Sequence, residues 1–373
     1  MDALATPSNW QKVRLGDIGK PCMCKRVMKH QTTRYGEIPF YKIGTFGNTA
    51  DAFISKKLFL EYKTKYSFPK KGDILISASG TIGRAVIYDG KPAYFQDSNI
   101  VWIDNDETLV KNDFLFYAYS HVKWNTEHTT ILRLYNDNFR NTLIPLPPLN
   151  EQIAIANILS DVDHYLYSLD ALILKKESVK KALSFELLSQ RKRLKGFNQA
   201  WQRVRLGDIA NYLTSNLSAE QITQQGKIKV YDVNNFIGYT NTTFISDKPY
   251  ISIVKDGSVG RVRILPPKTN ILSTMGALVA NHKTTTEFLF YLLSNFDFKN
   301  FTSGSIIPHI YFKDYKEKTI FLPPLNEQIA IANILSTLDN EIASLKNKKR
   351  QFENIKKALN HDLMSAKIRV LKK

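Results

Sequence analysis

Cysteine is scarce in this sequence, which has two among 373 residues, Cys22 and Cys24. Two thiols separated by one residue are too few and too close for a disulfide framework or a structural zinc site. We expect both to be ordinary reduced thiols. The seven histidines are scattered and form no metal-binding motif, so we expect no metal site in this chain.

Long hydrophobic runs are also missing. No apolar stretch approaches the roughly 20 residues that a helix needs to cross a bilayer. The first residues, MDALATPSNWQKVRLGD, contain no apolar region of the kind found in secretory signals. We therefore expect a cytoplasmic protein that does not act at a membrane.

Common catalytic motifs are absent as well. The sequence has no G-x-x-x-x-G-K-[ST] phosphate loop, no H-E-x-x-H motif and no G-x-S-x-G motif. Its two L-P-P-L motifs are superficially like an adenine-methyltransferase motif, but Leu146 and Leu322 stand where that motif has the Asp or Asn that holds the target amine. We expect a binding protein that is not an enzyme, and an enzyme with an unrecognised site is the alternative.

Negative charge is in short supply, because 34 Asp and Glu stand against 52 Lys and Arg, which gives a net charge of +18. A positive field of this size favours a polyanionic partner such as nucleic acid. The alternative is a basic surface without a ligand. The hydrophobic fraction of 43% is typical of a globular protein, so we expect a folded chain.

What the sequence does contain is an internal repeat. LPPLNEQIAIANILS at 146–160 returns without a change at 322–336. Three shorter motifs also recur, while the sequence between them has diverged. Two long copies of this kind indicate a tandem duplication rather than a solenoid. The three motifs are WQKVRLGDI at 10–18 and WQRVRLGDI at 201–209, GTIGRAVI at 80–87 and GSVGRVRI at 257–264, and KKAL at 180–183 and 356–359.

Each half is predicted to hold a domain with many short strands and one short helix. β-Branched and aromatic runs bounded by Gly, Asp or Asn are typical of strands and turns. The helix is predicted at DFLFYAYS, 113–120, and at its counterpart EFLFYLLS, 287–294. The predicted strands lie in 38–44, 72–78, 83–90 and 99–104 of the first half and in 228–233, 250–257, 260–265 and 270–274 of the second.

A long helix is predicted after each pair of prolines. Pro147 and Pro148 end the strand domain, Asn150 is a suitable N-cap, and Glu151 favours the positive end of the helix. Apolar residues then recur at intervals of three and four, as in a heptad repeat. Each helix has about 40 residues without proline or glycine and a length of roughly 60 Å. A helix of this length needs a partner, and we expect the two helices to pair.

The expected fold is therefore α+β. Two mixed α/β domains with many short strands are joined by two long helices, which form an antiparallel coiled coil with a pseudo-twofold internal repeat. We expect the two domains at opposite ends of this rod. The predicted boundaries are 1–149 for the first domain, 150–195 for its helical region, 196–325 for the second domain and 326–373 for the second helical region.

The doubled order of these motifs resembles the specificity subunits of type I DNA restriction–modification complexes, the HsdS family. The resemblance covers essentially the full length. It is carried by WQxVRLGDI at the start of each half, by PKKGDILISASGTIG at 69–83, and by LPPLNEQIAIANILS with its long helix at the end of each half. It implies two target-recognition domains that each read one half of a split double-stranded DNA site.

The resemblance also implies partners. The paired helices are expected to set the gap between the half-sites and to dock two methyltransferase (modification) subunits, which recruit the restriction and translocase subunits. No cofactor is expected on this chain, because S-adenosylmethionine, ATP and Mg are expected on partner subunits alone. The alternatives are a stand-alone DNA-binding regulator and a coiled-coil scaffold with two carbohydrate- or protein-binding domains, whose binding would depend little on salt.

Candidate DNA contacts lie at matching loop positions of the two halves. In GTIGR and GSVGR the glycines let the backbone approach a phosphate, and the alternative is an ordinary β-turn with a solvated arginine. Ahead of each proline pair, ILRLYNDNFR at 131–140 matches IIPHIYFKDY at 306–315. Alternating polar and aromatic side chains suit a DNA-facing strand, and the alternative is that the tyrosines pack beneath the domain. Segments 42–45 and 232–235 differ, which fits two half-sites and equally fits drift.

These matches pair Thr81 with Ser258, Arg84 with Arg261, Arg133 with His309 and Tyr135 with Tyr311. Arginine and lysine favour guanine edges, asparagine favours adenine, and basic or hydroxyl side chains also contact phosphates. The candidate DNA-binding residues are Lys42, Thr45, Thr81, Arg84, Arg133, Tyr135, Asn136, Asn138, Asn234, Asn235, Ser258, Arg261, Arg263, His309, Tyr311 and Lys313.

The perfect identity of 146–160 and 322–336 indicates either recent exchange between the repeats or two identical docking sites. If two copies of one methyltransferase bind, the same surface must appear twice. The basic runs at the helix ends, such as RKRLK at 191–195, are interpreted as a solvated or docking face, with phosphate contact along the gap as the alternative. The candidate docking residues are Glu151, Gln152, Asn157, Glu327, Gln328 and Asn333.

Overall fold

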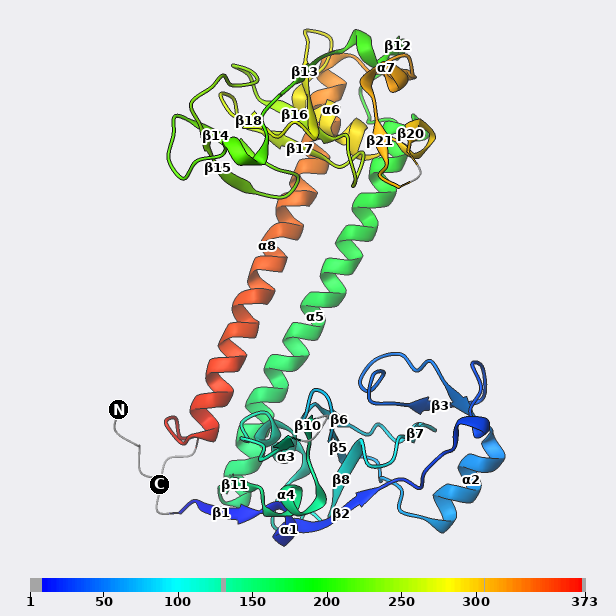
Figure 1. Cartoon of the computed structure of the whole chain (residues 1–373), viewed down its shortest axis with the longest axis vertical. Helices are drawn as coiled ribbons and strands as arrows, with labels where there is room; N and C mark the ends of the chain where they lie inside the picture. Colours follow the sequence, from blue (N-terminus) through cyan, green and yellow to red (C-terminus); the bar gives the residue numbers. More distant parts are fainter. Residues whose placement is uncertain (1–8, 129–131, 305, 371–373) are drawn as a thin grey trace. The chain divides into compact units, whose positions relative to one another are not determined.

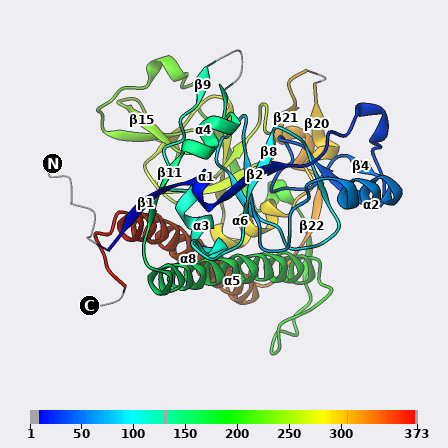
Figure 2. The same cartoon turned by 90° about the horizontal axis from the view of Figure 1, so that it is seen from below.

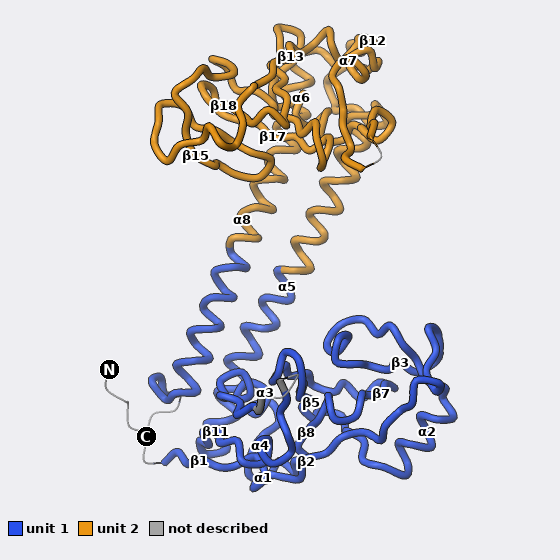
Figure 3. Tube along the Cα trace, viewed as in Figure 1, with its two compact units in different colours: residues 1–169, 348–373 blue, residues 170–347 orange. Residues whose placement is uncertain are grey.

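The computed structural model describes residues 9–128, 132–304 and 306–370. Two compact units divide the chain: unit 1 comprises residues 1–169 and 348–373, and unit 2 comprises residues 170–347 (Figure 3). Each unit contains one strand domain and a stretch of each long helix. The predicted boundaries, which assign the helices to regions of their own, stay a prediction.

The strand domain of unit 1 is built on a four-stranded antiparallel sheet in the order β2-β8-β5-β6 (Figure 1). The central strand β5, Ile74–Ser77, is buried along its whole length, as its run of apolar residues requires. A smaller sheet in the order β4-β3-β7 packs beside it. The remaining bounds in this domain are α1 Leu15–Ile18, β2 Gly19–Met23, β3 Ile38–Tyr41, β4 Phe53–Ile54, α2 Lys56–Lys65, β6 Ala85–Ile87, β7 Tyr94–Phe95, β8 Ile100–Asn105, α3 Asn112–Tyr119, β9 Glu127–His128, β10 Leu132–Arg133 and α4 Asn136–Asn141, with a 3₁₀ turn at Lys29–Gln31.

The strand domain of unit 2 repeats this topology. Its four-stranded sheet has the order β13-β19-β16-β17, and its three-stranded sheet has the order β15-β14-β18. The bounds are β13 Ala210–Thr214, β14 Ile228–Tyr231, β15 Phe236–Thr240, β16 Tyr250–Val254, β17 Val262–Leu265, β18 Asn270–Ile271, β19 Met275–Ala280, α6 Thr286–Ser294, β20 Thr302–Ser303, β21 His309–Ile310 and α7 Phe312–Tyr315, with 3₁₀ turns at Leu206–Asp208, Ala219–Gln221 and Lys299–Phe301.

All eight sequence ranges predicted as strands contain a strand, and both predicted short helices are confirmed as α3 and α6. A further pairing was not predicted. The repeat W-Q-x-V-R-L-G-D-I contains β1, Gln11–Arg14, and β12, Gln202–Arg205. These strands pair antiparallel with β11, Leu143–Leu146, and β22, Thr319–Leu322, which lead into the proline pairs. The first and last motifs of each half are therefore neighbours in space.

The two long helices are α5, Leu149–Leu188, and α8, Leu325–Met364. The prediction that Asn150 caps α5 is wrong by two residues, because the helix begins at Leu149 and the N-cap position is therefore Pro148. The Asn150 side chain instead accepts a hydrogen bond at 2.9 Å from the neighbouring Glu151 N–H. Pro148 lacks a backbone N–H, but an N–H at the start of a helix has no partner within the helix, so proline is tolerated there. Its fixed φ directs the chain into the helix.

Contacts within each unit show that α5 and α8 run antiparallel. In unit 1 the rings of Tyr165 and Phe352 lie 4.6 Å apart, and Asp163 pairs with Lys356. In unit 2 Lys176 pairs with Glu341 at 2.7 Å, and Lys180 pairs with Asp339. Residue numbers rise along one helix as they fall along the other, which confirms the predicted antiparallel coiled coil. The placement of the domains at opposite ends of a rod stays a prediction.

Each strand domain packs on the start of the long helix that follows it. In unit 1 the core joins Phe114 of α3 to Ile155 of α5, and α3 lies alongside α5 (Figure 2). In unit 2 the core joins Phe288 of α6 to Ile331 of α8. The cysteines lie in unit 1 as free thiols, and burial raises the pKa of Cys24 to about 12.

Candidate nucleic-acid interface

The G-x-x-G-R turn has the same backbone in both units, between β5 and β6 in unit 1 and between β16 and β17 in unit 2. The φ angles are +65° and +82° for Gly80 and Gly83, and +80° for both Gly257 and Gly260. Glycine adopts this left-handed region without the steric cost that a Cβ imposes. All four glycines are therefore explained by local conformation.

The two glycines of each turn have different surroundings. A Cβ on Gly83 would lie 2.1 Å from Nε1 of Trp124, and a Cβ on Gly260 would lie 2.6 Å from the ring of Phe298. A Cβ on Gly257 would meet nothing within 4 Å. The second glycine thus lets the turn pack closely against an aromatic ring, Trp124 in unit 1 and Phe298 in unit 2. The first leaves the backbone open to a ligand, as the predicted approach of a phosphate requires.

The segment ahead of each proline pair lies against this turn. Arg133 forms an isolated β-bridge with Ser79, and His309 forms the same bridge with Asp256. Ser79 and Asp256 are the residues that precede the first glycine of each turn. The structure therefore brings the two predicted segments together in both units and places Arg133 and His309 at equivalent positions.

A third segment joins the turn in both units. In unit 1 Arg84 donates a hydrogen bond at 3.0 Å to the carbonyl of Phe46. In unit 2 Arg261 donates at 2.9 Å to the Asn234 side chain, and Arg263 donates at 2.9 Å to the Asn234 carbonyl. The loops at 42–46 and 232–235 are thereby held beside the G-x-x-G-R turn. In unit 1 this junction encloses a cavity of about 300 Å³ lined by Ile43, Gly44, Ser77, Gly80, Thr81 and Arg84.

Several candidates have exposed side chains at this junction. Thr81, Ser258 and Asn235 are exposed. Tyr135 and Tyr311 are 40% and 50% exposed, so the interpretation that the tyrosines pack beneath the domain is wrong. Their phenol rings are placed as stacking or hydrogen-bonding groups would be.

Other candidates have partners within the domain. Lys42 forms an ion pair with Asp51 at 2.8 Å, and the Thr45 hydroxyl accepts a hydrogen bond at 3.1 Å from the Lys42 N–H. Asn136 is exposed at the start of α4, and Asn138, two residues further along the helix, is half-buried. Thr45 therefore shapes its loop, while Lys42 and Asn136 keep polar atoms at the surface.

His309 is held by a residue that sequence reasoning missed. Its Nδ1 lies 2.7 Å from Oδ1 of Asp256, and its ring stacks on Tyr311 with centroids 6.5 Å apart. The ammonium of Lys313 lies 5.6 Å from the centroid of the Tyr311 ring. A signal for Asp256 was available, since it immediately precedes the GSVGR motif. This chain of contacts orients the imidazole and links it through the Tyr311 ring to the ammonium of Lys313.

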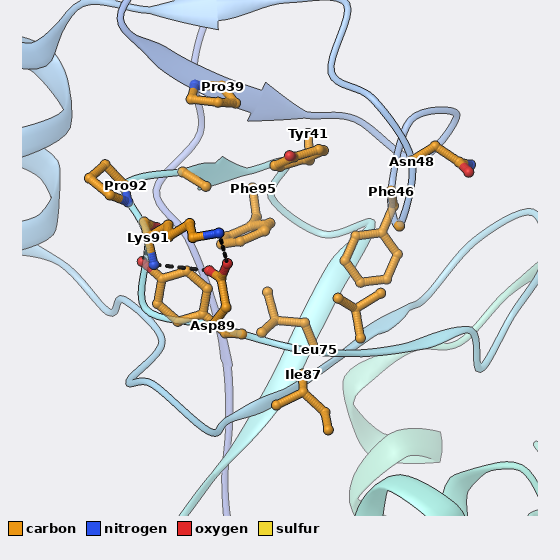
Figure 4. Close-up of a pocket in the computed structure, with 14 residues that line it drawn as sticks. Pro39, Tyr41, Phe46, Asn48, Leu75, Ile87, Asp89, Lys91, Pro92 and Phe95 are labelled. Carbon is orange, nitrogen blue, oxygen red and sulfur yellow. Dashed lines mark hydrogen bonds and ion pairs between the residues drawn. The ribbon is translucent and has the colours of Figure 1, made fainter. Parts of the chain in front are cut away.

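A larger cavity of about 450 Å³ adjoins the site in unit 1 (Figure 4). Its wall includes Tyr41 and Phe95, whose rings stack 5.9 Å apart, and Phe46, whose carbonyl holds Arg84. Lys91 and Asp89 form an ion pair at 3.4 Å on its wall. No predicted site residue lines this cavity.

The structure corrects four of the six predicted docking residues. Glu151, Gln152, Glu327 and Gln328 are at most 2% exposed, so a partner subunit cannot reach them. The side-chain amides of Gln152 and Gln328 are hydrogen-bonded within the unit through both the oxygen and the nitrogen. Gln152 accepts from the Lys111 N–H and donates to the carbonyls of Leu109 and Pro147. Gln328 makes the equivalent bonds to the Thr285 N–H and to the carbonyls of Lys283 and Pro323. These side chains bind the strand domain to its helix. Asn157 and Asn333 are exposed.

Within the ranges the structure describes, no group of three or more His, Cys, Asp and Glu side chains could hold a metal ion. Among the same residues, none of the helices combines the length and hydropathy of a membrane span.

The sequence matches the family model of the type I restriction modification DNA specificity domain twice, over residues 7–176 and 198–354. A putative type I restriction enzyme specificity subunit of Haemophilus influenzae is 64% identical over 148 residues, which span 39% of this chain and 38% of that protein. The putative type I restriction enzyme MjaX specificity subunit of Methanocaldococcus jannaschii is 28% identical over an alignment that covers 98% of this chain and 95% of that protein.

Solved structures share the fold. The S subunit of a type I restriction–modification system from M. genitalium aligns with a TM-score of 0.64 at 20% identity, over 97% of each chain. A chain from a structure on the assembly and conformational transition of a type I system aligns with a TM-score of 0.57 at 16% identity, over 97% of this chain and 99% of that one. With two matches to one family model, one in each repeat, this chain belongs to the type I restriction–modification DNA specificity family and carries two target-recognition domains.

Proposed function

We propose that this chain is the DNA-reading subunit of a type I restriction–modification complex, in which each strand domain reads one half of a split double-stranded site. One observation carries the proposal: the same three segments meet around the G-x-x-G-R turn in both units, with different side chains on the same backbone. Arg133 in unit 1 and His309 in unit 2 make the same β-bridge. Two domains with the same backbone arrangement but different side chains at equivalent positions suit the reading of two different half-sites.

The chemistry of the exposed groups fits this role. Arginine and asparagine donate to or accept from base edges in the major groove, and a guanidinium on a loop also binds phosphate. Arg84, Arg261 and Arg263 supply positive charge at the turn, and Asn234 and Asn235 supply amides beside it in unit 2. The net charge of +18 favours DNA over a neutral ligand.

The docking surface is proposed on the exposed face of the identical repeats. Leu149, Ile153 and Asn157 follow one another at intervals of four along α5, and all three are exposed. Leu325, Ile329 and Asn333 form the same face on α8. We name these two triplets the repeat faces. An apolar stripe of identical composition at each helix start suits two copies of one methyltransferase subunit, while the restriction and translocase subunits join through the complex.

Catalysis is assigned to the partners in this proposal. In this proposal the chain binds no cofactor of its own, and S-adenosylmethionine, ATP and Mg bind to the partner subunits in the cytoplasm. Turnover of DNA or nucleotide by the isolated chain would contradict this assignment.

The experiment that tests the proposal is methylated-base sequencing of a host genome with and without this gene. The expected result is the loss of adenine methylation at one motif, made of two short half-sites with a fixed gap, when the gene is deleted. Methylation that is unchanged in a host shown to produce the partner subunits would contradict it.

A further inference from the structure

Two repeated motifs, F-L-F-Y and K-K-A-L, meet in the structure around an aspartate that neither contains. In unit 1 the Tyr117 hydroxyl of α3 donates a hydrogen bond at 2.8 Å to Oδ2 of Asp163 on α5. Lys356 of α8 lies 2.5 Å from Oδ1 of the same carboxylate. Its ammonium is also 5.6 Å from the centroid of the Tyr117 ring. Three helices are thus fastened at one carboxylate.

Unit 2 contains the same arrangement with the long helices exchanged. The Tyr291 hydroxyl of α6 donates at 2.8 Å to Oδ2 of Asp339 on α8, and Lys180 of α5 forms an ion pair with Oδ1. The Lys180 ammonium lies 5.8 Å from the centroid of the Tyr291 ring. We call each trio, Tyr117–Asp163–Lys356 and Tyr291–Asp339–Lys180, a clamp. Each long helix contributes an aspartate to one clamp and a lysine to the other.

The sequence around the aspartates has otherwise changed. Immediately after the identical stretch, the first half reads DVDHYL at 161–166 and the second reads TLDNEI at 337–342, and the aspartate in the third position is the single identity. Tyr165, two residues later, becomes Glu341. A residue that is kept where its neighbours have diverged is kept for its contacts, and here those contacts are the tyrosine and the lysine.

The clamps hold the strand domains in a fixed orientation on the helix pair. Both tyrosines are buried, and burial together with the hydrogen bond to aspartate raises the pKa of Tyr117 and of Tyr291 well above the ordinary value, so both hydroxyls stay donors. A hydrogen bond to a charged acceptor is directional and stronger than a neutral one. Apolar packing between α3 and α5 tolerates sliding or rotation, whereas this bond specifies one position.

We propose that the two clamps are specificity-determining residues for the length of the gap in the split DNA site. The inference rests on the proposed function, in which the position of each strand domain on the long helices sets the number of base pairs between the half-sites. Because α5 and α8 each contribute to both units, a domain that turns on its helices shifts its half-site relative to the other. The clamps restrict this movement and so restrict the complex to one gap.

The test compares the double variant Tyr117→Phe/Tyr291→Phe with the wild-type chain, each assembled with its methyltransferase partner. The substrate is DNA carrying the two half-sites of the wild-type motif with the native gap, or with one base pair removed or added. Loss of one hydrogen bond to a charged group weakens a fixed geometry by about tenfold. Methylation at the altered gaps, relative to the native gap, should therefore rise by about tenfold, with the base preference in each half-site unchanged.

The control is Tyr167→Phe, which removes a phenol hydroxyl from an exposed side chain of α5 outside the clamps and should leave the gap preference unchanged. Thermal unfolding of every variant separates the effect from loss of folding. If the double variant does not fold, Asp163→Asn and Asp339→Asn, which keep an acceptor oxygen and lose the ion pair, replace it and should relax the gap in the same direction.

A folded, assembled variant that keeps the wild-type gap ratio overturns the clamp proposal and leaves the proposed function intact. A wild-type complex that methylates no split motif overturns the proposed function, and the clamp proposal falls with it.

Discussion

The guanidinium of Arg369 lies 2.7 and 2.9 Å from the two carboxylate oxygens of Glu151, although the residues are 218 positions apart in the chain. The indole N–H of Trp10 donates to the same carboxylate at 3.1 Å. In unit 2 Arg193 and Trp201 hold Glu327 in the same way. The strand domain, the start of one long helix and the segment that follows the other are thus joined at one buried charge in each unit.

Replacing this charge should destabilise unit 1. Glu151→Gln keeps the size of the side chain but leaves the Arg369 guanidinium without its counter-charge in a mostly buried site. Removing one partner of a buried pair costs about 3–5 kcal/mol, and the partial exposure of Arg369 reduces the expected loss to about 2 kcal/mol. Urea unfolding measures it, and Glu327→Gln should show a similar loss in unit 2.

The control for this prediction is Glu61→Gln, which removes an exposed carboxylate of α2 paired with Lys65. Its expected effect lies within about 0.5 kcal/mol of zero. Equal stability of Glu151→Gln and Glu61→Gln would show that the buried contact with Arg369 does not stabilise the fold.

Exchanging one side chain of the interface should alter one half-site. His309→Arg gives unit 2 the residue that unit 1 has at the same β-bridge. Because a bidentate base contact discriminates by about 1–3 kcal/mol, methylation should change by about fivefold to 150-fold at one position of the second half-site. Methylated-base sequencing reads both half-sites at once. The exposed Lys248→Ala is the control, and a change in the first half-site would contradict the assignment of one domain to each half.

A charge on one repeat face should remove one methyltransferase. Ile153→Asp places a carboxylate on the exposed apolar stripe of α5, and burying it without a partner costs about 2 kcal/mol or more. The assembly should change from two methyltransferase subunits per chain to one, as measured by the mass of the purified complex. Ile329→Asp should do the same at the other face, and the double variant should lose both. Tyr167→Asp, at an exposed position of α5 away from the face, should still assemble with two.

The two glycines of the G-x-x-G-R turn should differ in their tolerance of alanine. Gly80→Ala adds a Cβ that lies 3.8 Å from Ile43, so its cost comes from the positive φ and is about 1–2 kcal/mol. Gly83→Ala adds the same conformational cost and a clash with Trp124. Thermal unfolding should therefore show a lower midpoint for Gly83→Ala than for Gly80→Ala. A smaller loss at Gly83 would contradict the packing role assigned to Trp124.

Local patterns were sufficient for the secondary structure. The apolar runs around Ile74 and Ile251 form the central strands, and the three-and-four spacing after each proline pair forms α5 and α8. These elements depend on residues adjacent in the chain, which is why the sequence reveals them. The start of α5 was misplaced by two residues, because Asn150, a common capping residue, already lies inside the helix. The pairing of Arg133 with His309 was also found from the repeat, since the two residues lie the same number of positions ahead of Leu146 and Leu322.

Which repeated residues face a partner and which face the core is not a local property. Glu151 and Gln152 were predicted to dock a partner because they recur unchanged as Glu327 and Gln328. However, residues that make the same buried contacts in both units would be unchanged for the same reason as residues that form two identical docking surfaces. The tertiary structure decided in favour of the interior, because Trp10 and Arg369 bring their donors to Glu151 from distant parts of the chain. The sequence by itself determined the duplication, the strands, the paired helices and the family. Tertiary contacts decided which of the repeated side chains hold each unit together, since burial depends on segments that the chain brings together only when it folds.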